Sequence, residues 1–245
     1  MSVMPLTNVD DRYYAWVRER VAVAKRLNKG ECGGSYGDAM LILSAILSGL
    51  AADLWPGKRK DRHRFVELWA THARPDLNPN LISVPLLLED LQKSGDTALV
   101  NKLSAIYPEA FSRKINLLSV TGEQVDQTEE ELISLDSKLA SKDLRYSSYG
   151  DVFYKHVRSG YTHEYHTTDS AIPFPMISEP APVSYVPVLV KQPQPQTQRR
   201  IYFDVAWVAE LVESVSDSVT PLMHQQPLAE PASWWIDGTS LAKRE

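Results

Sequence analysis

The chain has 245 residues, a formal net charge of −5 and one cysteine, Cys32. Hydrophobic residues make up 43% and charged residues 23%, which excludes a disordered chain, a collagen-like repeat and a coiled-coil rod. A single cysteine excludes an internal disulfide framework and a multi-cysteine zinc site, and it fits a reducing compartment. The acidic balance argues against a surface coated with cations for nucleic acid, although it leaves room for a small basic cleft.

The same sequence predicts a cytoplasmic protein. Residues 1–11 lack a basic start followed by an apolar run, so no signal peptide is expected. The most apolar stretch, 39–55, is interrupted by serine, glycine and aspartate, and it is shorter than the roughly 20 residues that a membrane-spanning helix needs. We therefore expect a buried core helix there and no membrane partner.

Helices are predicted through the first half of the chain. Apolar residues at spacings of three and four give one stripe over 13–27, and a glycine-rich loop over 28–34 ends that helix. Ser35, followed three residues later by Asp38, is typical of a capping box. The helix that this box opens, 36–55, is apolar nearly all round and is expected at the centre of a bundle. Shorter helices are expected over 65–72, 85–93 and 96–107, and after the N-cap candidate Thr128.

The composition changes in the proline-rich part of the chain. Seven of the 16 prolines fall within 173–195, so this segment is not an ordinary helix. Stretches rich in β-formers over 185–191 and 200–204 predict a two-stranded ribbon. The loop between the strands is expected over 192–198, and Pro187 indicates an edge strand.

The expected fold class is mainly α, a helical bundle with a small two-stranded β appendage near the C-terminus. Three parts are predicted: a helical domain over 1–170, a proline-rich segment with the β-ribbon over 171–204, and a C-terminal helix and tail over 205–245 packed on the same domain. The helix is expected over 205–219, because its valines and leucines share one face. The pair Trp234 and Trp235 in the tail is expected to dock on the chain's own core.

Reactive side chains concentrate in residues 154–166. This segment holds three of the six histidines together with Arg158. Arginine carries a permanent charge that suits phosphate oxygens, and histidine, with an ordinary pKa of about 6.5, exchanges a proton at neutral pH. Together they suit cleavage of a phosphodiester by the 2′-hydroxyl of RNA, a reaction that needs no metal.

The spacing of Arg158 and His163 limits this interpretation. On an ideal helix, at about 100° per residue, two side chains five positions apart point roughly 140° apart. They converge only if the helix ends or kinks between them, or if their partners lie on another subunit. Gly160 is the residue at which such a break is expected. Taken alone, an arginine and a histidine at this spacing are more often a solvated residue and a structural one.

The sequence Y-K-H-V-R-S-G-Y-T-H-E-Y over 154–165 resembles the signature of HEPN domains (higher eukaryotes and prokaryotes nucleotide-binding). The glycine-rich loop, the apolar second helix and the basic turn into 64–68 are also similar to that family, so the resemblance spans 13–166. It implies a helical bundle that dimerises through the motif helices. It also implies a metal-independent endoribonuclease, because many members have this activity in toxin–antitoxin, abortive-infection and antiviral-defence systems.

Carried over to this chain, the resemblance implies that Arg158 stabilises the scissile phosphate and that His163 transfers protons. Ser159 stands at the polar position where asparagine or cysteine is usual. No cofactor or metal is implied; the implied partners are an RNA substrate, a second copy joined through the Arg158/His163 helix, and an antitoxin or defence-system partner. The substrate-binding candidates are Ser159, His156, His166, Lys58 and Arg59.

Two alternatives stay open at this point. Some HEPN domains are inactive, so the chain could be an RNA- or protein-binding module that acts with a partner. His163 and His166 with Glu164 could instead hold a transition metal, although their spacing matches no firm metal signature. The basic run over 58–64 could likewise follow an RNA backbone or be a solvated turn.

Overall fold

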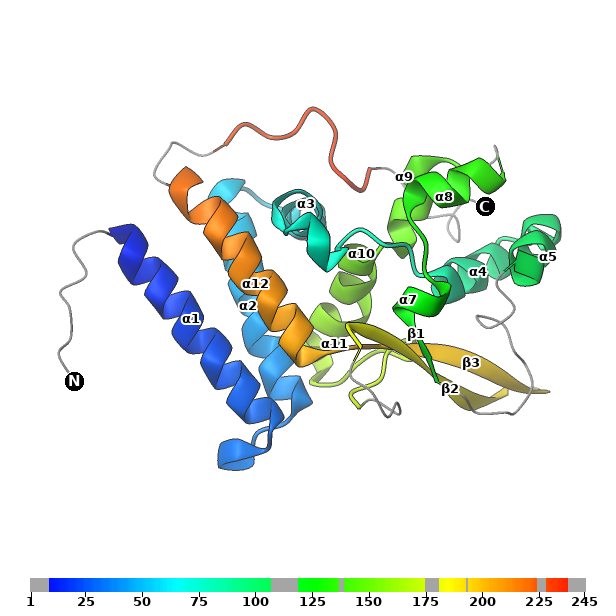
Figure 1. Ribbon diagram of the computed structural model, residues 1–245, viewed down its shortest axis with the longest axis horizontal. Helices are drawn as coiled ribbons and strands as arrows, with labels where there is room; N and C mark the ends of the chain where they lie inside the picture. The colour runs from blue at the N-terminus through cyan, green and yellow to red at the C-terminus, as the bar shows by residue number, and fades with distance from the viewer. Residues whose placement is uncertain are drawn as a thin grey trace. The chain divides into compact units, whose positions relative to one another are not determined.

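The computed structural model describes residues 9–106, 119–136, 139–174, 181–192, 194–223 and 228–237. The fold is mainly helical with a small antiparallel sheet near the C-terminus, as predicted (Figure 1). The chain divides into two compact units: Met1–Pro79 with Val205–Trp234, and Asn80–Asp204 with Trp235–Glu245. This division passes through the range 1–170 that the sequence analysis assigned to one helical domain, and it groups the C-terminal helix with the N-terminal helices.

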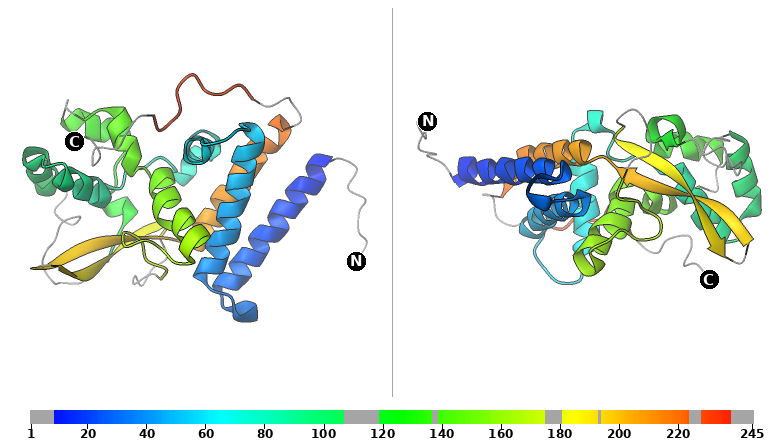
Figure 2. Two further views of the ribbon diagram at one scale, coloured as in Figure 1. Left: turned by 180° about the vertical axis from the view of Figure 1, so that it is seen from behind. Right: turned by 90° about the horizontal axis from the view of Figure 1, so that it is seen from below.

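The first unit is a helical bundle. Helices α1 (Val9–Asn28) and α12 (Val205–Val219) both pack on α2 (Tyr36–Leu54), and α3 (Asp61–His72) packs on α2 and α12. Figures 1 and 2 show α1, α2 and α12 side by side. Each helix buries an apolar stripe, which is the main source of stability for helices of this length. Short 3-10 turns complete the unit: η1 (Glu31–Gly33), η2 (Pro75–Leu77) and η5 (Thr220–Leu222).

Helix α2 is the central helix of this unit, as its apolar surface predicts. It begins with the expected capping box: the Asp38 N–H donates to the Ser35 hydroxyl at 3.4 Å, and the Ser35 N–H donates to the Asp38 carboxylate at 2.8 Å. Among the described residues α2 is the one helix long and apolar enough to cross a membrane. This is weak evidence for a span, because 56% of its apolar window is buried inside the structure, as in a core helix.

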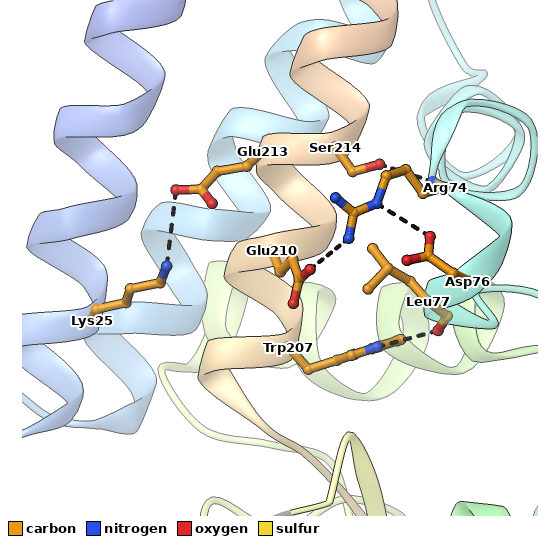
Figure 3. Close-up of polar contacts among 8 residues, drawn as sticks. All are labelled: Lys25, Arg74, Asp76, Leu77, Trp207, Glu210, Glu213 and Ser214. Atoms are coloured by element: carbon orange, nitrogen blue, oxygen red, sulfur yellow. Dashed lines mark hydrogen bonds and ion pairs between the residues drawn. The ribbon is translucent and has the colours of Figure 1, made fainter.

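Polar contacts fasten α12 to the segment that follows α3 (Figure 3). The Arg74 guanidinium pairs with Glu210 at 2.5 Å, while the Arg74 backbone N–H donates to the Ser214 hydroxyl at 2.8 Å. One turn away, the Trp207 indole N–H donates to the Leu77 carbonyl at 3.2 Å. A helix from the end of the chain is therefore tied to helices from its beginning.

The tryptophan tail docks on the chain itself, as expected. The ring of Trp234 meets Trp55 edge-on, with the two centroids 5.7 Å apart. Trp235 belongs to the second unit, where the guanidinium carbon of Arg145 lies 4.1 Å from its ring centroid. Neither indole is left as a free stacking platform for a base.

The second unit combines short helices with a three-stranded sheet. The predicted N-cap Thr128 is confirmed, because its hydroxyl accepts the Glu131 N–H at 3.2 Å at the start of α8. The helix predicted over 96–107 runs over Thr97–Ile106, and residue 107 lies outside the described residues. The helical segments in chain order are α4 (Val84–Lys93), α5 (Thr97–Ile106), α7 (Gly122–Val125), α8 (Glu129–Leu135), α9 (Ser141–Leu144), η3 (Arg145–Ser147), α10 (Tyr149–Phe153), η4 (Tyr154–Arg158) and α11 (Ser159–Glu164).

The long loop predicted over 192–198 is wrong. Strands β2 (Val183–Gln192) and β3 (Gln194–Phe203) pair along their whole length, down to Gln192 opposite Gln194 (Figure 2). Antiparallel backbone pairing does not depend on apolar side chains, and edge strands tolerate prolines, so a Gln- and Pro-rich stretch can still be strand. A third strand, β1 (Val120–Thr121), pairs with the start of β2. Residues 175–180 and 193 of the proline-rich segment lie outside the described residues.

Candidate active site

The candidate residues lie on one continuous helical run in the second unit, made of α10, the π-helical turn η4 and α11. In η4 the Tyr154 carbonyl accepts the Ser159 N–H, five residues on, and also the Ser159 hydroxyl at 2.8 Å. A π-turn of this kind carries one more residue per turn than an α-helix and is frequent at functional sites. We refer to the run from Tyr149 to Glu164 as the motif helix.

The motif helix is anchored at its start by a buried hydrogen-bond cluster. The hydroxyls of Tyr149 and Tyr185 donate to the same Asp126 oxygen at 2.6 and 2.7 Å, and the Val84 N–H donates to the other oxygen at 3.0 Å. Burial raises the pKa of Asp126 to about 7, while these three hydrogen bonds act to lower it. The cluster joins α10 to β2 and to the start of α4, so it sets where the motif helix begins.

Arg158 and His163 point away from different sides of this helix. Arg158 is half-buried, and its guanidinium carbon lies 5.0 Å from the Tyr154 ring centroid, a cation–π contact. His163 is exposed on α11, and the helix runs without interruption from Ser159 to Glu164. The two side chains are therefore roughly 140° apart around the helix axis. One chain does not aim both at a single phosphate.

The helix break considered at Gly160 is absent. Gly160 lies inside α11, and the helix ends instead at Tyr165, which has a left-handed backbone (φ 57°). After this turn the chain folds back along the helix, and a Cβ on Gly160 would overlap the carbonyl oxygen of His166. Glycine is needed here for the close approach of the returning chain rather than for a kink.

The other polar residues of the motif make local contacts. The Nδ1 of His156 lies 2.6 Å from the Thr168 hydroxyl, and the Thr168 N–H donates to the His156 carbonyl at 3.1 Å. His166 is exposed, with Nε2 3.0 Å from the Glu164 carboxylate. His156 thus ties the helix to the returning chain, while Ser159 bonds within the helix. Their substrate contacts, like those of His166, stay a prediction.

No metal centre forms among the residues that the structure describes. There, no three histidine, cysteine, aspartate or glutamate side chains gather as a metal site requires. The pair His166 and Glu164 is an exposed ion-pair contact between neighbours in sequence. The metalloprotein alternative therefore has no geometric support in this part of the chain.

The basic run over 58–64 is partly used for structure. Lys60 pairs with Glu230, and Arg64 pairs with Asp61 and donates to main-chain carbonyls after α2. Lys58 and Arg59 are exposed and form no ion pair with a carboxylate in the part of the chain that the structure describes. They belong to the first unit, whereas Arg158 and His163 belong to the second, so a shared RNA site stays a prediction.

Sequence reasoning missed a pocket beside the motif helix. It lies between α4 and the motif helix and has a volume of about 80 Å³. Glu89 and Lys93 line it from one side and Lys155 and His156 from the other. Only His156 had been a candidate. The one signal available in the sequence was Glu89 itself, an acidic residue placed among leucines on the half-buried side of an amphipathic helix.

Comparison with known proteins adds no assignment: no family model, curated protein or solved structure matches this chain.

Proposed function

We propose that the chain is a metal-independent endoribonuclease of the HEPN type that acts as a homodimer. The observation that supports this best is the placement of Arg158 and His163 on one unbroken helix of the second unit, with His163 exposed. An arginine that neutralises phosphate oxygens and a histidine that titrates near neutral pH are the two groups that RNA transesterification requires.

In the proposed reaction the 2′-oxygen of one nucleotide attacks the adjacent phosphorus. The P–O bond to the 5′-oxygen of the next nucleotide breaks, which leaves a 2′,3′-cyclic phosphate and a free 5′-hydroxyl. One His163 accepts the proton of the 2′-hydroxyl, and a second His163 donates a proton to the departing 5′-oxygen. Arg158 stabilises the extra negative charge that gathers on the phosphorus oxygens in between.

A dimer follows from the helix geometry within this proposal. Because Arg158 and His163 diverge by roughly 140° on one helix, one chain does not present both to the same phosphorus. Two motif helices packed about a two-fold axis supply two histidines and two arginines to one shared cleft. In this arrangement His163 of one subunit acts as the base, and His163 of the other subunit acts as the acid.

The test is cleavage of mixed RNA by the purified full-length protein in the presence of EDTA. We compare the wild type with Arg158→Ala and His163→Ala, and with His72→Ala, a histidine of the first unit outside the basic run, as the matched control. The proposal predicts cleavage that survives EDTA, is reduced at least about 100-fold in the first two variants, and is unchanged in the third. Products should carry 2′,3′-cyclic phosphate ends.

Two outcomes would reject the nuclease assignment. If the wild type binds RNA tightly but does not cut it, the chain is a non-catalytic binding module. If EDTA abolishes cleavage and a metal is recovered with the protein, the chemistry is that of a metal centre instead.

A further inference from the structure

The pocket between α4 and the motif helix has an unbalanced set of polar groups. Lys155 pairs with the buried Asp151 at 3.3 Å, and Lys93 pairs with Asp90 at 3.6 Å, so both ammonium groups that line the pocket already have a carboxylate. Among the described residues Glu89 forms no such ion pair, and its side chain is half-buried. The group that a ligand would satisfy is therefore a hydrogen-bond acceptor.

The state of Glu89 fits this imbalance. Burial raises the pKa of Glu89 to about 7, and only the nearby charges of Lys93 and Arg200 act to lower it. A carboxylate held in this way gains most from a ligand that brings two N–H donors to its two oxygens, because charge-assisted bidentate hydrogen bonds are the strong ones. An anionic ligand would leave Glu89 unsatisfied.

The walls of the pocket favour a partly apolar ligand. Leu86 and Val152 line it together with the ring of the buried Tyr146. A water molecule needs about 10–15 Å³ by this measure, so 80 Å³ admits roughly six waters, which is close to the room that one heteroaromatic base occupies.

Position connects the pocket to the proposed reaction. Lys155 and His156 line the pocket and precede Arg158 by three and two residues on the same helix. The axial distance between them is only about 3–5 Å, less than the length of one extended nucleotide. Along the helix axis, a base next to a phosphate that lies at Arg158 is therefore within reach of the pocket.

Resting on the proposed function, we propose that the pocket receives a guanine base next to the scissile phosphate, with Glu89 accepting the N1–H and N2–H groups of its Watson–Crick edge. Guanine is the RNA base that presents two adjacent N–H donors there. Adenine and cytosine present one donor beside an acceptor, and uracil presents one donor between acceptors. The enzyme is then expected to cut RNA beside guanosine.

The experiment measures equilibrium binding of mononucleotides to the full-length protein by calorimetry. GMP is expected to bind at least about tenfold more tightly than AMP, CMP or UMP. A tenfold difference in affinity corresponds to one charge-assisted hydrogen bond that the other nucleotides cannot form. Inosine monophosphate, which lacks only the 2-amino group, is expected to lose a similar factor. The variant Glu89→Gln should weaken GMP and abolish its advantage over inosine monophosphate, while the exposed-carboxylate control Glu19→Gln should bind GMP as the wild type does.

The outcomes separate this inference from the nuclease proposal. Equal binding of GMP and inosine monophosphate by the wild type overturns the guanine pocket without using any variant, so a folding defect in Glu89→Gln cannot obscure the result. Glu89-dependent GMP binding without RNA cleavage supports the pocket and rejects the nuclease. RNA cleavage with no preference for guanosine supports the nuclease and rejects the pocket.

Discussion

At the residue scale, Asp126 is an acidic side chain buried inside the second unit. It is fully buried, and its two oxygens accept three hydrogen bonds from Tyr149, Tyr185 and Val84. Such a cluster orders three separate elements around one carboxyl group. It also couples the start of the motif helix to the ionisation of a buried acid.

This coupling predicts how stability depends on pH. Because the pKa of Asp126 is raised from 3.8 in the unfolded chain to about 7, the folded protein binds more protons than the unfolded chain between these values. The contribution of this carboxyl to stability is therefore present at low pH and is lost as pH rises from about 4 to 7, with a slope of at most about 1.4 kcal/mol per pH unit.

The measurement is urea unfolding at a series of pH values for the wild type and Asp126→Asn. The variant loses some stability at every pH, because the amide has one acceptor oxygen and cannot accept from both the Val84 N–H and the two tyrosine hydroxyls. Its free energy of unfolding should nevertheless fall less steeply with pH than that of the wild type over this interval. The exposed Asp237→Asn is the control and should keep the wild-type slope. Parallel curves for the wild type and Asp126→Asn would contradict the prediction.

At the element scale, the return of the chain after the motif helix depends on Gly160. An alanine is ordinarily the better helix former by about 1 kcal/mol, and Gly160 lies inside α11. Its Cβ would overlap the backbone oxygen of His166, however, which cannot move without breaking the Thr168–His156 contact. We expect Gly160→Ala to destabilise the protein in spite of its helix propensity.

The control for this prediction is Gly49→Ala in α2. Gly49 is exposed inside the helix, and nothing lies within 4 Å of the position its Cβ would take. This substitution should stabilise the protein by about 0.5–1 kcal/mol in thermal unfolding. If both substitutions shift the midpoint in the same direction, the proposed role of Gly160 is wrong.

Elements with local signals could be predicted from the sequence. The capping residues Ser35 and Thr128 mark the starts of α2 and α8, and the apolar period of α12 identifies its buried face, including Val208 and Leu211. The length of the β2–β3 ribbon could not be predicted from composition. Its Gln- and Pro-rich end is extended because the two strands pair with each other, and its residues are not strong strand formers.

For the candidate site, the sequence singled out candidate residues and their separation on an ideal helix, but not whether the helix breaks between them. Arg158 and His163 could be singled out by residue type, and their divergence follows from an unbroken helix. The role of Gly160 could not be predicted, since it depends on the contact with His166. The pocket at Glu89 was equally invisible, because α4 and the motif helix are about 60 residues apart in the chain.

At the scale of the whole molecule, the proposed function makes activity a property of the dimer. The double variant Arg158→Ala/His163→Ala should therefore inactivate the wild-type chains with which it forms mixed dimers. With a ninefold excess of the double variant, random pairing leaves about a tenth of the wild-type chains in wild-type dimers, so activity per wild-type chain should fall about tenfold.

The comparison is RNA cleavage after co-refolding the two chains, against the same mixture combined after separate refolding and assayed at once. Only the co-refolded sample should lose activity. Unchanged activity in both samples would show that each chain works independently and that no shared cleft exists.

The π-helical turn η4 changes the direction in which the side chains of α11 point around the helix axis. Each residue of an α-helix turns the following side chains by about 100°, so the one additional residue in Tyr154–Arg158 rotates all of α11 relative to α10. The face of α10 that packs on Phe203 and the face of α11 that carries His163 are thereby set independently of each other. An insertion of one residue thus lets the same helix stay anchored in the core while its outer end is aimed elsewhere.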